Sequence, residues 1–201
     1  MRTIRCKKKD TGRVIDVLKA GGLVAFPTDT VFGLACIMDK EAMNKVYEVK
    51  GRSFDKPLPL MCDSLKMIKK VAVVSEDAEK VYEKFMPGAL TLIFEKKKGI
   101  AKWVTMGKDS VGIRVPDDEF ILNIIKEIKR PLMVTSANLS NEGSLLKWED
   151  VYECLKGKID AIVCEDARGE KASTIIDVRG DIKVLREGPI SLKEIKEAIN
   201  Q

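Results

Sequence analysis

The sequence predicts an α/β or α+β protein with a mixed sheet, and three observations lead to this fold class. Six or more short apolar runs typical of strands alternate with segments whose apolar residues recur at helical spacing. Two apolar runs near the C-terminus flank Arg179-Gly180-Asp181 and predict an antiparallel hairpin. The chain has 201 residues, of which 45% are hydrophobic, and can bury one substantial core. We therefore expect residues 1–201 to form a single domain.

The individual elements follow from the same patterns and from their boundary residues. Asp39 and Ser191 are good N-caps, and Gly21-Gly22 ends the first helix. Helices are expected at 11–20, 40–50, 64–71, 75–86, 120–128, 150–156 and after Ser191. Strands are expected at 23–26, 58–62, 89–94, 111–115, 131–134, 161–164, 174–178 and 182–185. Pro59 cannot donate a hydrogen bond to a neighbouring strand, so we expect strand 58–62 to lie near a sheet edge.

The composition excludes several classes of protein. Five cysteines, widely spaced and accompanied by no histidine, indicate neither a disulfide framework nor a zinc site, and we expect no protein-held metal. The cysteines suit a reducing cytosol, no apolar run approaches the ~20 residues of a membrane span, and the N-terminus lacks a secretory signal, so we expect a cytoplasmic protein. Without histidine, Ser-His and Cys-His nucleophile pairs are impossible.

Polar and cationic clusters follow several apolar runs, where α/β proteins place ligand sites. They begin at Thr28, Lys50, Ser110, Thr135, Ser173 and Leu185. Positive charges gathered in one concave site repel one another unless a ligand neutralises them. The cations Lys50, Arg52, Lys56, Arg114 and Arg186 therefore predict a polyanion such as a nucleoside triphosphate. The groups expected to bind phosphate, ribose and a small polar substrate are those of Thr28, Thr30, Ser136, Asn138, Ser144 and Ser173.

Each cluster also has a purely structural interpretation. Lys50 and Arg52 could cap the C-terminus of a helix, and Arg114 could form an ion pair on an edge strand. The segment from Thr135 to Asn138 could be a surface turn. The formal net charge of +5 could reflect only a solvated surface of mixed charge.

Taken in order, the segments PTDTVFGL, KGRSFDKPL, SVGIRVP, TSANLSNEGS, STIID and LREG resemble the YrdC-like family, the threonylcarbamoyl-AMP synthases that prepare a group for transfer RNA modification. The resemblance spans roughly residues 12 to 190. It implies a single twisted open sheet flanked by helices, with a concave cationic cavity. It also implies a nucleotidyltransferase that forms threonylcarbamoyl-AMP and diphosphate from L-threonine, bicarbonate and ATP. Mg2+ bound to the triphosphate is expected on charge grounds. The partners implied are the tRNA threonylcarbamoyl transferase machinery, and contact with RNA.

The resemblance also assigns roles to individual residues. Lys50 and Arg52 are the implied catalytic residues. ATP binding falls to Arg52, Lys56, Ser110, Ser136, Asn138, Ser144 and Arg186. Threonine binding falls to Thr30, Arg114 and Ser173.

Three residues depart from the family pattern, and two other functions remain open. Met61 stands where some members have histidine, Phe32 where tyrosine is common, and Asn141 where glycine is usual. The segment PLPLMC is also similar to a sister group of the same fold, whose members could bind nucleotide or double-stranded RNA without synthase activity. A small kinase or a nucleotidyltransferase acting on another metabolite would retain ATP but change the acceptor.

Overall fold

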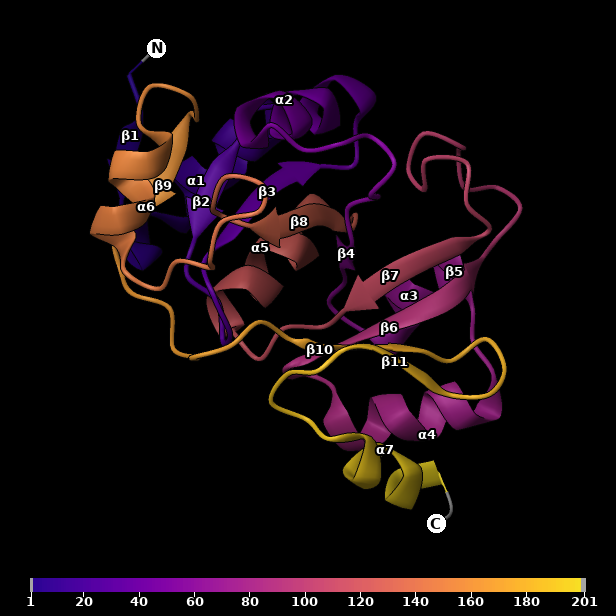
Figure 1. Ribbon diagram of the computed structural model, residues 1–201. Coiled ribbons are helices and arrows are strands. Elements are labelled where there is room, and N and C mark those ends of the chain that lie inside the picture. Colours follow the sequence, from indigo (N-terminus) through magenta and orange to yellow (C-terminus); the bar gives the residue numbers. More distant parts are fainter. Residues whose placement is uncertain (1, 200–201) are drawn as a thin grey trace.

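A computed structural model describes residues 2–199, and one mixed sheet of eleven strands runs through them (Figure 1). The strand order is β1-β9-β2-β3-β8-β4-β7-β6-β10-β11, and β5 pairs separately with β6. The strands are β1 (Ile4–Cys6), β2 (Val24–Phe26), β3 (Gly33–Ile37), β4 (Leu60–Met61), β5 (Ala72–Val73), β6 (Leu90–Lys96), β7 (Ser110–Arg114), β8 (Leu132–Ser136), β9 (Ala161–Val163), β10 (Thr174–Asp177) and β11 (Lys183–Arg186). The predicted fold class, an open mixed sheet flanked by helices, is confirmed.

The helices begin and end close to the expected residues. They are α1 (Thr11–Lys19), α2 (Lys40–Lys50), α3 (Leu65–Val71), α4 (Glu76–Phe85), α5 (Glu119–Ile128), α6 (Trp148–Leu155) and α7 (Leu192–Ile199), with a short 3-10 helix at Lys8–Asp10. Asp39 accepts hydrogen bonds from the N–H groups of Glu41 and Ala42, as expected of an N-cap. Gly51 ends α2 with a φ of 59°, a left-handed conformation that glycine adopts without strain.

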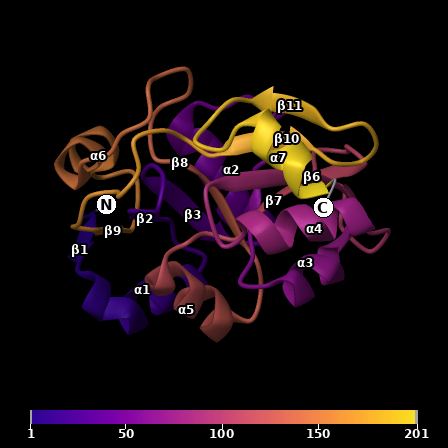
Figure 2. The same ribbon diagram turned by 90° about the horizontal axis from the view of Figure 1, so that it is seen from below.

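The two faces of the sheet are covered differently. α1 packs on β2 and β3 and contacts α5, and Figure 2 shows α1, α5 and α3 together on one side of the sheet. The apolar side chains of these helices are buried, Leu18, Ile68 and Ile121 among them. Loops from several strand ends lie on the other side, which faces the viewer in Figure 1. The site must be sought on this second side.

Three details of the fold differ from the expectations. Strand β4 lies inside the sheet, between β8 and β7, and not near an edge. Pro59 precedes β4, and its carbonyl accepts a hydrogen bond from Val134 (3.0 Å), so its missing N–H interrupts no pairing. Strands β1, β3 and β5 were not expected. In the case of β3, the polar loop after Phe26 gives no sign of the hairpin that joins β2 to β3. Helix α6 begins at Trp148, two residues before the expected start at residue 150.

None of the helices within residues 2–199 combines the length and the apolar character needed to cross a bilayer.

Candidate functional site

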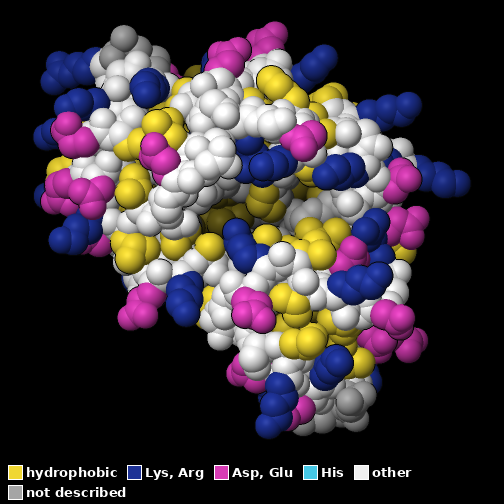
Figure 3. Space-filling model, viewed as in Figure 1, with side chains coloured by type: hydrophobic (Ala, Val, Ile, Leu, Met, Phe, Trp, Pro, Cys, Tyr) yellow, Lys and Arg dark blue, Asp and Glu magenta, His cyan; other side chains and the backbone are white. Residues whose placement is uncertain are grey.

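One cavity opens on the loop-covered side of the sheet, near the centre of the view in Figure 3. Its volume is about 270 Å3. Figure 3 shows hydrophobic side chains at its floor and Lys and Arg side chains around it. Strands β3, β4, β6, β7, β8 and β10 all contribute to its lining. The lining residues that the sequence had suggested are Thr28, Thr30, Arg52, Ser110, Arg114, Ser136, Ser173 and Arg186.

The loop that joins β2 to β3 forms one wall of the cavity. Thr28 and Thr30 are each 2% exposed, so their hydroxyls need partners inside the protein. The Thr28 Oγ1 hydroxyl donates to the carbonyl of Val31 (2.7 Å), accepts from the N–H of Thr30 (3.0 Å) and lies 3.0 Å from Thr30 Oγ1. Thr28 is therefore fully used in shaping the loop. Thr30 also lines the cavity, and its hydroxyl lies between Thr28 Oγ1 and Arg114 Nη1.

Arg114 holds this loop against the end of β7. Its Nη1 donates to Thr30 Oγ1 (2.6 Å), its Nη2 to Asp29 Oδ1 (2.6 Å) and its Nε to the Gly88 carbonyl (3.0 Å). Both side chains of the Arg114–Asp29 ion pair are almost fully buried. Burial lowers the pKa of the Arg114 guanidinium, and Asp29 acts in the opposite direction by stabilising the charge. The ion pair that we had considered as an alternative for Arg114 does form, but β7 is an interior strand and not an edge strand.

Ser173 and Arg186 form the opposite wall, where β10 and β11 meet. Arg186 Nε and Nη2 donate to the Ser173 carbonyl (3.0 and 2.8 Å), and Nη2 also donates to Ser173 Oγ (3.1 Å). Ser173 Oγ lies 2.8 Å from Thr91 Oγ1. Burial lowers the pKa of Arg186, and the nearby positive charge of Arg114 lowers it further. The two guanidinium groups are thus close enough to repel, as expected of a site that takes an anion.

The glycine of the LREG segment has a specific packing role. A Cβ on Gly188 would lie 2.4 Å from the Thr174 N atom and 2.6 Å from the Ala172 carbonyl oxygen, so any larger residue would push the chain away from β10. The turn after Arg186 therefore lies against the segment that carries Ser173. This contact explains why the residue at position 188 is a glycine.

Arg52 reaches the cavity from the loop after α2. Its Nε donates to the Lys56 carbonyl (3.0 Å) and its Nη2 to the Pro57 carbonyl (3.4 Å). Among residues 2–199, no carboxylate forms an ion pair with Arg52. A half-buried arginine without a counter-ion is well placed to receive a phosphate group.

Four residues of the predicted site do not line the cavity. The Lys56 and Ser144 side chains are exposed. Asn138 is buried, and its Nδ2 donates to the carbonyls of Leu139 and Glu142 (both 2.8 Å), which is the local turn that we had considered as an alternative. Lys50 is 3% exposed, and its Nζ donates to the carbonyls of Ser136 and Asn138. Its ammonium group therefore fixes the loop after β8 and does not cap its own helix.

The buried position of Lys50 predicts a pH effect on stability. Burial, with a smaller contribution from Arg52, lowers the pKa of Lys50 from 10.5 to about 8. Between pH 8 and 10.5 the unfolded chain keeps this proton while the folded chain loses it, so the free energy of unfolding rises with pH by up to about 3 kcal/mol from this group. We expect this rise in the wild type and not in Lys50→Met, as measured by urea unfolding from pH 7 to 10.5.

A matched control for this experiment is available on the same helix. Lys40→Met removes an exposed lysine from the start of α2 and should retain the wild-type pH profile. Equal pH slopes in the wild type and Lys50→Met would contradict the burial of the Lys50 ammonium group.

The departures from the family pattern can be located. Met61 and Phe32 both line the cavity. Asn141 lies in the loop after β8 with a φ of 70°, a conformation that explains why glycine is usual there and that asparagine tolerates better than most residues. We therefore expect Asn141 to preserve the path of this loop.

Sequence reasoning missed three polar contributors to the site. Asp29 lies in the segment PTDTVFGL, but nothing in the sequence assigned it to Arg114. Thr91 and Thr105 line the cavity from β6 and from the loop before β7. Thr91 sits in an apolar run that reads as an ordinary strand, and only the alternation of faces along it could have suggested that it points away from the helices.

The carboxylates are arranged unfavourably for a protein-held metal. Within residues 2–199 no three His, Cys, Asp or Glu side chains gather as a metal site would require. Asp29, the carboxylate beside the cavity, is occupied by Arg114. A magnesium ion bound here would rely mainly on oxygens of a phosphate ligand and of water.

An open mixed sheet with a cavity of cations and hydroxyls on one face defines an α/β protein that binds an anionic ligand. Residues 16–188 match the family Sua5_yciO_yrdC, described as Telomere recombination. The threonylcarbamoyl-AMP synthase of Pyrococcus abyssi is 36% identical over 188 residues, which make up 92% of this chain and 55% of the relative. A putative threonylcarbamoyl-AMP synthase of Methanocaldococcus jannaschii is 34% identical over 197 residues, 94% of this chain and 92% of the relative.

A solved structure agrees with these relatives. The crystal structure of P. abyssi Sua5 complexed with L-threonine matches with a TM-score of 0.88 and 33% identity, over 98% of this chain and 60% of that chain. The chain thus spans little more than half of the Pyrococcus protein and nearly all of the Methanocaldococcus one. This chain belongs to the Sua5/YciO/YrdC family, and the resemblance predicted from its sequence is confirmed.

Proposed function

We propose that the chain, acting as a single domain, is an L-threonylcarbamoyladenylate synthase that supplies threonylcarbamoyl-AMP for modification of tRNA. The observation that carries the proposal is the convergence of Arg52, Arg114 and Arg186 with the hydroxyls of Thr30 and Ser173 around one cavity. Relatives named threonylcarbamoyl-AMP synthase, and a related structure with L-threonine, support the same activity. By this proposal the enzyme is a nucleotidyltransferase.

The reaction has two steps with balanced bonds. The threonine amine attacks bicarbonate, and a carbamate forms with loss of water. A carbamate oxygen then attacks the α-phosphorus of ATP, and the bond from that phosphorus to the oxygen of the departing diphosphate breaks. Mg2+ enters with the triphosphate. Because the substrate supplies its own nucleophile, the protein needs no histidine, and its cations stabilise the charge that develops on phosphate oxygens.

The two walls of the cavity suggest how the substrates divide it. We propose that the threonine carboxylate and hydroxyl bind near Thr30, Arg114 and Ser173, where buried hydroxyls surround a buried cation. Arg52, Ser110, Ser136 and Arg186 then receive the nucleotide. Lys50 acts on the nucleotide through the loop after β8, which it holds by two carbonyls. Lys56, Asn138 and Ser144 retain a role in ATP binding only if that loop and the loop after α2 close over the ligand.

The proposal is tested by measuring diphosphate. The purified protein is incubated with ATP, Mg2+, bicarbonate and threonine, and the same mixture with serine, or without bicarbonate, serves as the control. We expect diphosphate release that depends on both threonine and bicarbonate. Absence of release from folded protein that binds ATP would instead favour the sister-group function, binding of nucleotide or double-stranded RNA without turnover. RNA binding would show an affinity that falls steeply with salt.

The proposed product implies a place and partners. An acyl adenylate is reactive, so a tRNA threonylcarbamoyl transferase must use it close to where it forms, in the cytoplasm. Direct contact of this chain with RNA remains part of the proposal and is measured in the same salt titration.

A further inference from the structure

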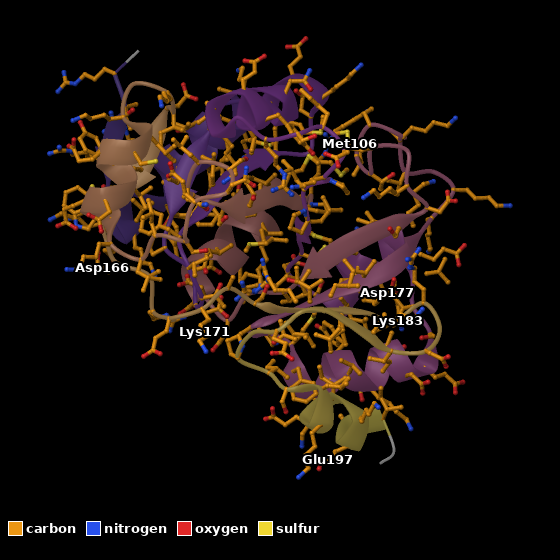
Figure 4. All side chains as sticks on the ribbon, in the orientation of Figure 1. Met106, Asp166, Lys171, Asp177, Lys183 and Glu197 are labelled. Carbon is orange, nitrogen blue, oxygen red and sulfur yellow. The ribbon has the colours of Figure 1, made fainter. Side chains whose placement is uncertain are left out.

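The segment between β9 and β10, residues 165–172, crosses the protein beside the β2–β3 loop, and we call it the strap. Asp166 and Lys171, labelled in Figure 4, mark its two ends. The N–H of Arg168 donates to the Thr28 carbonyl (3.0 Å). A Cβ on Gly169 would lie 2.6 Å from the Thr30 Cα atom and 2.7 Å from the Asp29 carbonyl oxygen. The strap therefore lies directly on the backbone of the residues that hold Arg114.

The side chain of Arg168 anchors the strap to α5. Its Nη2 lies 3.5 Å from Asp118 Oδ2 and also donates to the carbonyl of Asp117. Asp118 is 3% exposed and accepts a hydrogen bond from the N–H of Ile121 (3.3 Å) as the N-cap of α5. The carboxylate is thus fixed by a helix that belongs to the buried core. The strap has no regular secondary structure, and its backbone is held by hydrogen bonds from Ala167 to Leu146 and from Arg168 to Thr28. The Arg168 side chain adds an attachment to the start of α5.

The strap continues directly into the site. Ala172 and Ser173 both line the cavity, and Ser173 is one of the hydroxyls proposed for threonine. One face of the strap fixes Asp29 and Thr30, and its end delivers Ser173. A displacement of the strap would therefore move both walls of the threonine position. Of the residues proposed for the nucleotide, Arg186 contacts Ser173, whereas Arg52 and Ser110 belong to other segments.

We propose that Arg168 is a positioning residue that holds the strap against Asp29 and Thr30 and thereby sets the affinity for the amino-acid substrate. The claim about threonine rests on the proposed function. The anchoring of the strap does not depend on it. Gly169 also helps to position the strap, because only a residue without a Cβ lets the strap approach Thr30 so closely.

The chain offers a matched control for this proposal. Lys8 also pairs with Asp118, with its Nζ 2.9 Å from Oδ2, but it lies outside the strap. Arg168→Ala leaves Asp118 paired with Lys8, and Lys8→Ala leaves it paired with Arg168. Both variants remove one cation from the same carboxylate. A difference between them therefore reports the strap and not the cap of α5.

The experiment compares the wild type, Arg168→Ala, Arg168→Lys, Lys8→Ala and Gly169→Ala. KM is measured for threonine and for ATP, together with kcat, and hydrogen exchange is followed over residues 165–172. We expect Arg168→Ala and Gly169→Ala to raise the KM for threonine about 10-fold, a fraction of the ~100-fold that a 1 Å displacement can cause. The KM for ATP should change less than about twofold, Arg168→Lys should restore part of the loss, and Lys8→Ala should match the wild type.

Two sets of outcomes overturn the proposal. Equal behaviour of Arg168→Ala and Lys8→Ala, or an equal rise of both KM values in Arg168→Ala, would remove the specific role of Arg168. Lack of threonine-dependent diphosphate release by the wild type would overturn the proposed function instead. In that case hydrogen exchange still decides the anchoring: faster exchange of the strap in Arg168→Ala alone supports it, and unchanged exchange overturns it.

Discussion

Replacing Arg114 by methionine is expected to lower the free energy of unfolding by about 3 to 5 kcal/mol, the usual result of removing one partner of a buried ion pair. The Asp29 carboxylate would stay in a nearly dry site without its cation, and the Thr30 hydroxyl and the Gly88 carbonyl would each lose a donor. Urea unfolding at pH 7 measures the stability. Threonine-dependent diphosphate release should fall to background in the same variant.

Two further variants separate charge from geometry at Arg114. Arg114→Lys retains a positive charge but cannot contact Asp29, Thr30 and Gly88 at once, so we expect intermediate stability and very low activity. Arg114→Met combined with Asp29→Asn removes both charges and should recover part of the stability without any activity. If Arg114→Met unfolded within about 1 kcal/mol of the wild type, the ion pair would not be buried as described.

The predictable parts of the fold are those that depend on residues close together in the sequence. The helix from Lys40 to Lys50 has its cap and its apolar face in the sequence, Asp39 acts as the expected cap, and the helix has the expected bounds. The C-terminal hairpin was likewise visible, and β10 and β11 pair antiparallel. Strand β3 was missed, because the polar loop after Phe26 gives no sign of its hairpin with β2, and its pairing with β8 joins residues about a hundred positions apart.

The residues of the site were likewise predictable only where residue type and local position were enough. Residue type and position predicted that Arg114, Arg186 and Thr30 would belong to a polar cavity, because each lies at the end of an apolar strand or in the loop that follows one. They could not predict that Lys50 turns away, because a lysine at the end of a helix reaches several places and the carbonyls of Ser136 and Asn138 become neighbours only in the folded sheet. The ion pair between Asp29 and Arg114 could not be predicted either, because these two residues also become neighbours only in the folded protein.

Replacing Arg52 by alanine is expected to weaken ATP binding by about 10- to 100-fold, which corresponds to the ~1.5 to 3 kcal/mol of a hydrogen bond to a charged group. The fold should remain intact, because Arg52 is half-buried and gives its hydrogen bonds to two loop carbonyls, those of Lys56 and Pro57, that water can reach in its place. Calorimetric titration with ATP measures the affinity. Urea unfolding should give a free energy within about 0.5 kcal/mol of the wild type.

Lys56→Ala is the control that separates a direct contact between Arg52 and a phosphate from a general effect of positive charge on ATP affinity. Lys56 carries the same charge four residues away, but its side chain is exposed and does not line the cavity. If only the net positive charge of the region attracted ATP, both variants would lose similar affinity, and the loss would diminish in high salt. If Arg52 contacts a phosphate directly, its variant loses much more than that of Lys56. Equal losses of affinity in the two variants, or an unchanged affinity in Arg52→Ala, would show that Arg52 does not bind the nucleotide. Arg186 would then be the arginine expected to bind the phosphates.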